Sequence, residues 1–144
     1  MATLTLVRGL PGSGKSTYSK KLIERTHAQH FEADMFFEHP QTGYEFDFLL
    51  LEAAHKWCYG SAVRALWYGH DVVVSNTFTK MWELEQYLEI PLIVNGVQIK
   101  VVEMRTQFQN IHGLPEAKME VMRTRWEQLP EDFPHFTKVI DQHD

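Results

Sequence analysis

The sequence predicts an α/β fold in which helices cover both faces of a parallel β-sheet. Short runs of β-branched residues alternate with longer segments whose apolar residues recur at three- and four-residue intervals. Helical connections between successive strands favour parallel pairing. A glycine-rich turn follows the first strand, and such sheets bind ligands beyond the carboxyl ends of their strands. A chain of 144 residues has the length of one domain, and we expect residues 1–144 to form a single one.

The first half of the chain is expected to alternate strand and helix twice. The expected elements are a strand at 3–8, a helix from 15 to about 29, a strand at 30–33, a loop from about 37 to 45, and a helix that begins after Asp47 and ends before Gly69. Aspartate is a good helix-capping residue, so Asp47 is the expected cap of this last helix.

The second half continues the alternation. The expected elements are a strand at 71–75, a helix at 80–88, a strand at 98–104, a helix from about Pro115 to about residue 128, and an edge strand at 136–140. The glycine-rich turn, Asp34 and residues 75–78 then lie at the carboxyl ends of strands, where we expect the ligand site.

Composition excludes several classes of protein. No segment approaches the roughly 18–20 apolar residues of a membrane span, so we expect no membrane partner. The N-terminal residues lack the pattern of a signal peptide and the chain has a single cysteine, Cys58, which together favour the cytoplasm. The net charge of -5 argues against a protein that coats nucleic acid non-specifically.

Residues 9–17, GLPGSGKST, match the phosphate-binding loop G-x-x-x-x-G-K-[ST] at every fixed position, between a predicted strand and a predicted helix. Backbone N–H groups of such a loop face the phosphates, Lys15 reaches the β- and γ-phosphates, and the Ser16 hydroxyl binds Mg²⁺. We therefore expect ATP and Mg²⁺ as cofactors, with Ser16 as the metal ligand. The predicted nucleotide-binding residues of the loop are Gly9, Pro11, Gly12, Ser13, Gly14, Lys15, Ser16 and Thr17.

Asp34 follows the second predicted strand and is the candidate general base. From there a carboxylate would face the γ-phosphate and could accept the proton of an acceptor hydroxyl. The alternative is a solvated aspartate that only caps the turn. Length, together with candidate segments for an acceptor site and a lid, favours a small kinase over a motor ATPase. The expected fold is thus a three-layer P-loop NTPase of the kinase type, with a small helical lid.

Several segments beyond the phosphate loop resemble the polynucleotide 5′-kinase-like branch of the P-loop kinases. The matching segments, in order, are RGLPGSGKST, ADMFF, GYEFDFLLLEAAHKWC, VVVSNT, NIHGLP and MRTRWE. The resemblance implies transfer of the γ-phosphate of ATP to a hydroxyl, the 5′-OH of a polynucleotide in the best-known relatives, with Asp34 as the base. It places His112 where the family has a lid arginine, so that Arg123 or Arg125 would supply the fixed positive charge. A structural histidine before Gly113 is the alternative.

The sequence departs from the family pattern in two further ways. Phe37 stands where the phage enzymes carry an arginine that holds the acceptor phosphate, which weakens the polynucleotide assignment. Relatives carry an aspartate at this strand end, at the position of Ser75 or of Asn76, so weaker support for magnesium is expected here. Loss of one charged hydrogen bond costs about 1.5–3 kcal/mol, which corresponds to a slower kinase rather than an inert one.

Three functions therefore stay open. The first is a kinase for a 5′-OH nucleic acid end or a nucleotide-like acceptor. The second is a small-molecule or nucleoside kinase, and the third is an ATP-binding domain without catalysis. Tyr44 and Phe46 could stack on a base of the acceptor or pack at the start of the following helix. The eight histidines have no metal-ligand spacing and are interpreted as surface or packing residues.

Overall fold

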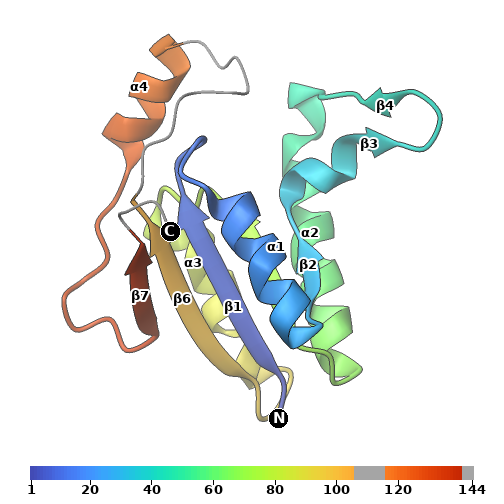
Figure 1. Cartoon of the computed structure of the whole chain (residues 1–144), viewed down its shortest axis with the longest axis vertical. Coiled ribbons are helices and arrows are strands. Elements are labelled where there is room, and N and C mark those ends of the chain that lie inside the picture. The colour runs from blue at the N-terminus through green and yellow to red at the C-terminus, as the bar shows by residue number, and fades with distance from the viewer. Residues whose placement is uncertain (106–115, 141–144) are drawn as a thin grey trace.

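A computed structural model of the chain describes residues 1–105 and 116–140, which form three layers with a β-sheet in the middle (Figure 1). The sheet holds five parallel strands in the order β2-β5-β1-β6-β7. Their bounds are β1 Thr3–Gly9, β2 Gln29–Phe31, β5 Val72–Asn76, β6 Gln98–Met104 and β7 Phe136–Ile140. The predicted parallel sheet is confirmed, with β7 at one edge as expected.

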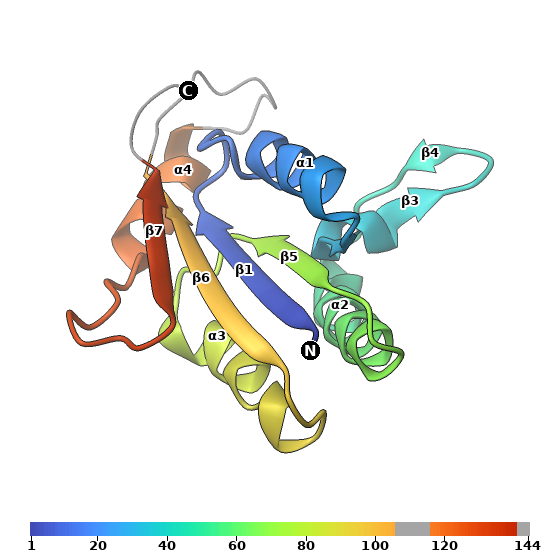
Figure 2. The same ribbon diagram turned by 60° about the horizontal axis from the view of Figure 1, so that its bottom comes forward.

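Helices cover both faces of the sheet, as Figure 2 shows: α1 (Lys15–Thr26) lies on one side, and α2 (Leu51–Trp67) and α3 (Met81–Leu88) lie on the other. The alternation of side chains along β1 sets this division. Val7 packs toward Leu22 of α1, whereas Leu4 and Leu6 belong to the larger cluster that includes Leu84 of α3. The remaining helix, α4 (Glu116–Arg125), lies beyond the carboxyl ends of the strands, where the predicted lid belongs.

Two helix ends differ from the sequence-based expectation. α1 stops at Thr26 because His27 adopts a left-handed conformation with φ 58°. α4 stops at Arg125 because tertiary contacts hold the next two residues: Trp126 packs against the Arg8 guanidinium at 3.8 Å, and the Glu127 N–H donates to the Thr79 carbonyl at 2.7 Å. A helix cannot continue where its backbone donors have partners elsewhere.

The predicted loop at 37–45 contains regular structure. A 3₁₀ helix, η1 (Ala33–Phe37), carries Asp34 and leads into a small antiparallel hairpin of β3 (Glu38–His39) and β4 (Gly43–Tyr44). Asp47 does cap a helix, since its Oδ1 accepts from the Leu49 N–H at 3.0 Å, but the helix is the short 3₁₀ turn η2 (Phe48–Leu50) that precedes α2. A third such turn, η3, spans Ile90–Leu92.

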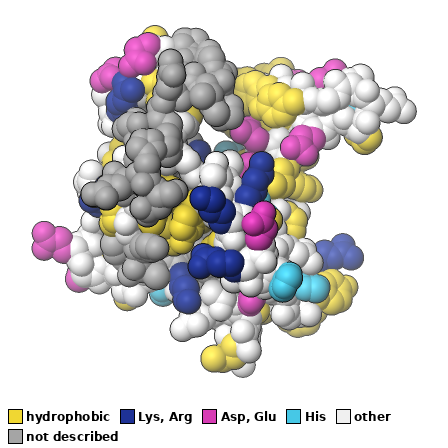
Figure 3. All heavy atoms as spheres, in the orientation of Figure 1, with side chains coloured by type: hydrophobic (Ala, Val, Ile, Leu, Met, Phe, Trp, Pro, Cys, Tyr) yellow, Lys and Arg dark blue, Asp and Glu magenta, His cyan; other side chains and the backbone are white. Residues whose placement is uncertain are grey.

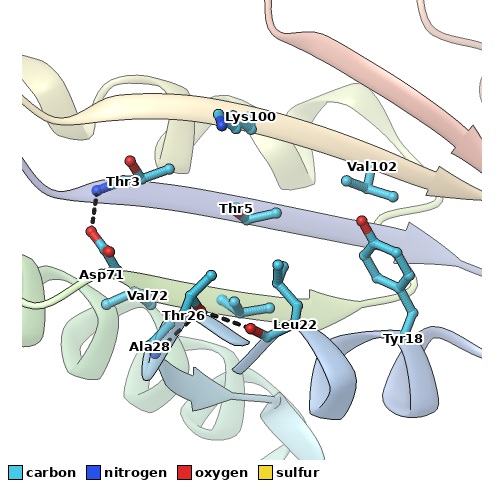
Figure 4. A pocket seen from close by; sticks show the side chains of 11 residues that line it. Thr3, Thr5, Tyr18, Leu22, Thr26, Ala28, Asp71, Val72, Lys100 and Val102 are labelled. Atoms are coloured by element: carbon cyan, nitrogen blue, oxygen red, sulfur yellow. Dashed lines mark hydrogen bonds between the residues drawn. The ribbon is translucent and has the colours of Figure 1, made fainter. Parts of the chain in front are cut away.

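A hollow of about 250 Å³ lies under α1 near the amino ends of the strands (Figure 4). Thr3, Thr5 and Lys100 line it from the sheet, and the Asp71 carboxylate closes one end by accepting from the Thr3 N–H at 2.8 Å. This hollow is at the opposite end of the sheet from the phosphate loop. Among the described residues, none of the helices has the length and apolar character needed to cross a bilayer.

Candidate phosphotransfer site

The phosphate loop lies at the carboxyl end of β1 and opens into a cleft of about 2430 Å³. Gly12 and Gly14 have φ of 81° and 89°, values that favour glycine, and Gly14 directly precedes α1. Six of the predicted loop residues line the cleft, namely Pro11, Gly12, Gly14, Lys15, Ser16 and Thr17. Small-ligand pockets are usually about 300–1,000 Å³, so this cleft has room for a nucleotide and a second substrate.

Gly9 and Ser13, also predicted to bind nucleotide, lie behind the cleft. Gly9 ends β1, and Ser13 is fully buried. A Cβ on Gly9 would collide with Ser13 Oγ and would approach the Met104 Cβ to 2.9 Å. The absence of a side chain at position 9 therefore lets the loop fold back against β6. These two residues support the shape of the loop, and their predicted contact with the nucleotide stays a prediction.

Substitution of Gly9 by alanine is expected to lower the free energy of unfolding by about 1–3 kcal/mol, the usual cost of overpacking. Gly60 is the matched control: it lies inside α2 and nothing approaches the position of its absent Cβ within 4 Å. Gly60→Ala should raise stability by about 0.5–1 kcal/mol. Urea unfolding measures both, and equal shifts in the two variants would contradict the close approach at Gly9.

Lys15 carries the positive charge of the loop and lines the cleft as a half-buried residue. Burial lowers the pKa of its ammonium group, and the negative charges of Glu32 and Asp34 oppose that shift. Two carboxylates therefore lie close enough to Lys15 to act on it electrostatically. Both come from the turn that follows β2.

Asp34 lines the cleft from the first turn of η1. The Tyr44 hydroxyl donates to its Oδ1 at 3.1 Å, across from the hairpin strand β4. Partial burial and the Asp34 charge raise the pKa of Tyr44 to about 12, so the phenol keeps its proton at neutral pH. Tyr44 is thus a fixed donor that orients Asp34.

Glu32, which the sequence analysis did not single out, contacts the phosphate loop directly. Its Oε1 accepts from the Ser16 hydroxyl at 2.8 Å and lies 3.4 Å from Nε2 of His30. Burial alone would raise the pKa of Glu32, but the hydrogen bonds from His30 and Ser16 and the charge of Lys15 outweigh it and lower the pKa. The signal that could have found Glu32 is its spacing, two residues before Asp34 at a strand end.

Ser75 and Asn76, at the end of β5, line the same cleft but have partners in the protein. The Ser75 hydroxyl lies 2.5 Å from Ser19 Oγ and 2.9 Å from Nε2 of His30. The Asn76 Oδ1 accepts from the Ala33 N–H at 3.0 Å, and its amide donates to Cys58 Sγ at 3.7 Å. Ser75 thus holds His30 of β2, and Asn76 holds the turn that carries Glu32 and Asp34.

The lid contributes positive charge from α4, although not from all the predicted residues. Arg125 lines the cleft, and so does Lys118, which the prediction did not include. Arg123 departs from the prediction: its guanidinium pairs with Glu116 at 2.6 Å and Glu120 at 3.0 Å on its own helix, and it does not line the cleft. His112 lies outside the described residues.

Exposed apolar side chains extend the cleft along the hairpin and η2. They belong to Tyr44, Phe46, Phe48 and Leu49, which are 56%, 51%, 73% and 86% exposed. Figure 3 shows hydrophobic side chains gathered over this end of the molecule. Phe37 is buried beneath this surface, with its ring 5.0 Å from that of Phe46. Phe37 is therefore a packing residue of the hairpin.

The oxygen donors near Lys15 fit Mg²⁺. This ion prefers oxygen ligands and is usually bound through one or two carboxylates together with substrate phosphates. Ser16 offers a hydroxyl, and Glu32 offers a carboxylate that contacts it. Among the described residues, no group of three or more His, Cys, Asp or Glu side chains could hold a metal by itself. The donor set therefore suits a cation that arrives with the nucleotide.

A phosphate loop facing a carboxylate across an open cleft, on a five-stranded parallel sheet, defines a P-loop kinase-like domain. The sequence profile of the AAA domain family matches residues 4–113, and the chain belongs to this family. The chain is also 33% identical over 138 residues to human NEDD4-binding protein 2; the match covers 88% of this chain and 8% of that protein.

Solved structures with the same fold carry different functional names. A Chloroflexus aurantiacus protein provisionally described as a kinase has a TM-score of 0.76 at 18% identity, covering 97% of this chain and 85% of that one. A gluconokinase from Sinorhizobium meliloti has a TM-score of 0.64 at 16% identity, covering 98% and 84%. The Pnkp1/Rnl/Hen1 RNA repair complex contains a chain with a TM-score of 0.57 at 20% identity, covering 91% and 41%. Such likeness shows the fold and leaves the acceptor undetermined.

Proposed function

We propose that the protein transfers the γ-phosphate of ATP to a hydroxyl group, with the 5′-OH of a polynucleotide as the acceptor. One observation carries the proposal: Lys15 and Asp34, from turns after different strands, line one cleft. The Asp34 charge also acts on the Lys15 ammonium group, which supports the proposal that a phosphate held at Lys15 meets a hydroxyl held at Asp34. An ATP-binding domain without catalysis would have no need of an oriented carboxylate at this place.

The chain's own residues carry the reaction by positioning and charge, which dominate phosphoryl transfer. The N–H groups of the loop and Lys15 hold the phosphates, and Mg²⁺ bound at Ser16 would neutralise charge on their oxygens. The acceptor oxygen bonds to the γ-phosphorus while the bond from that phosphorus to the β–γ bridging oxygen breaks, and ADP leaves. The acceptor proton passes to Asp34, through Oδ2, since Tyr44 holds Oδ1.

The aromatic surface beside Asp34 supports a polynucleotide acceptor. Phe46 and Phe48 are half or more exposed and line the cleft on the side of Asp34. Base–aromatic stacking contributes about 1–3 kcal/mol per base and tolerates any base. Because Lys and Arg residues in the cleft are interspersed with Glu and Asp, the site suits recognition of one strand end by stacking rather than of a long backbone by charge.

A small-molecule kinase is the second candidate, and Phe37 favours it. This residue replaces the arginine that the resemblance would lead one to expect, and its burial leaves no cation at that position to hold an acceptor phosphate. The gluconokinase likeness is consistent with a small acceptor on this fold.

Incubation with γ-labelled ATP and three acceptor pools separates the candidates. The pools are 5′-OH DNA and RNA oligonucleotides, nucleosides, and small hydroxylated metabolites such as sugars. We expect label on the oligonucleotides, and none with the Lys15→Ala variant, because this change removes the cation that faces the phosphates. Label confined to a small molecule would select the second candidate. ATP binding without transfer to any pool would leave only a binding domain.

A further inference from the structure

We propose that Glu32 supplies the carboxylate that supports the nucleotide-bound divalent cation, by accepting the hydrogen bond of the metal-binding Ser16 hydroxyl. This gives the residue that follows β2 a task that related proteins commonly give to an aspartate at the end of the strand next to the phosphate-loop strand. The inference deepens the proposed function and rests on it only in taking the bound nucleotide to be Mg²⁺–ATP.

The contact between Ser16 and Glu32 has the chemistry that this task requires. A serine that gives a lone pair to a cation keeps its hydroxyl proton, which becomes more acidic and needs an acceptor. Glu32 Oε1 accepts the hydrogen bond of this hydroxyl at 2.8 Å, which leaves both lone pairs of Ser16 Oγ available to a cation. Partners of metal ligands that fix orientation in this way typically change metal affinity by about 10–100-fold when removed.

The neighbouring strand explains why the carboxylate comes from the residue that follows β2. Phe31 of β2 pairs with Val74 of β5, so Glu32 and Ser75 follow at the same level of two adjacent strands. Ser75 is 2% exposed and its hydroxyl is held between Ser19 and His30. His30 in turn lies 3.4 Å from Glu32. The uncharged end of β5 thus forms one side of the arrangement that holds Glu32 against Ser16.

Asn76 holds the backbone between Glu32 and Asp34, so the two carboxylates have different partners. The Asn76 side chain accepts from the Ala33 N–H and so fixes the residue between Glu32 and Asp34. Glu32 is held on the side of Ser16, whereas Asp34 is held by Tyr44 of the hairpin. One carboxylate therefore faces the cation site, and the other faces the acceptor.

The test measures ATP binding rather than transfer, with a fluorescent ATP analogue titrated in MgCl₂ and in EDTA. Glu32→Gln keeps an amide oxygen at this position but makes it an uncharged and weaker acceptor, so we expect Mg²⁺–ATP binding weakened about tenfold, the lower end of that range. Metal-free ATP binding should be unchanged or tighter, because a negative charge near the phosphates is gone. Glu38→Gln removes the same charge from the same cleft and should leave both affinities within about twofold of the wild type. A merely structural role for Glu32 would weaken binding in both buffers.

A double-mutant cycle with Ser16→Ala decides whether Glu32 acts through that hydroxyl. If it does, the Glu32→Gln change should add little to the loss already caused by Ser16→Ala. Equal Mg²⁺–ATP affinity for Glu32→Gln and wild type, fully additive losses, or no magnesium dependence of binding in the wild type would each overturn the inference. Magnesium-dependent binding without phosphate transfer would count against the kinase function alone, so the two failures are distinguishable.

Discussion

Replacing Arg8 with methionine is expected to lower the free energy of unfolding by about 3–5 kcal/mol, because it leaves the Glu103 carboxylate charged and buried without its main partner. Both side chains are 0% exposed, and Arg8 Nη1 lies 2.8 Å from Glu103 Oε1 on the neighbouring strand. Within the described part of the chain, Arg105 is the one cation left to pair with Glu103, and its side chain is half exposed. Since domains are stable by about 5–15 kcal/mol, this variant would be close to unfolding.

Arg8 also holds backbone groups on which the site depends. Its guanidinium donates to the carbonyl of Phe78 at 2.6 Å and to that of Glu127 at 2.9 Å. Phe78 has a φ of 47°, an unusual value for a phenylalanine, which persists only where the surroundings hold it. Loss of Arg8 would therefore also release the loop after β5 and the segment after α4.

Urea unfolding followed by circular dichroism measures the effect. Arg123→Met is the matched control, because Arg123 also pairs with two carboxylates but does so on the surface of α4, where little change is expected. The double variant Arg8→Met/Glu103→Leu should recover much of the loss, since an apolar pair of similar volume commonly replaces a buried ion pair without cost. An unchanged urea midpoint for Arg8→Met alone would contradict this account of the pair.

Asp34→Asn is expected to slow phosphate transfer by about 100- to 10,000-fold, the usual contribution of a general base. The substitution keeps the shape of the side chain and the hydrogen bond from Tyr44 but removes the proton acceptor. Affinity for Mg²⁺–ATP should change little, because Asp34 is assigned to the acceptor side of the cleft. Single-turnover kinetics with labelled ATP and a 5′-OH oligonucleotide measure the rate of the chemical step.

Tyr44→Phe distinguishes the base from the residue that orients it. Removing the phenol costs one hydrogen bond, about 0.5–1.5 kcal/mol, so the rate should fall only about two- to tenfold. A loss as large as that of Asp34→Asn would indicate that orientation, not proton acceptance, is what Asp34 provides. Full activity in Asp34→Asn would remove Asp34 from the mechanism.

The sequence predicted the fold well because the signals for it are local. The segments predicted as strands at 98–104 and 136–140 form β6 and β7 with the same bounds. The phosphate loop has a fixed spacing that requires its glycines wherever it occurs, so its place between β1 and α1 followed from nine residues. The predicted helix ends were less accurate. α4 ends before its predicted bound because Trp126 packs on Arg8, and the Glu127 backbone bonds to Arg8 and Thr79.

The sequence by itself determined a parallel sheet, a phosphate loop and a carboxylate near the end of β2, because periodicity and motif spacing act within a few turns of chain. Only the tertiary structure decided that Glu32 accepts from Ser16 and that Arg123 pairs on its own helix, outside the cleft. It also decided that Ser75 contacts His30 and that Asn76 accepts from the backbone of Ala33, just before Asp34. These contacts depend on strand order and on which side chains compete for the same space. The β2–β5 pairing brings together residues about 45 positions apart, as in the His30–Ser75 contact, and no local pattern encodes it.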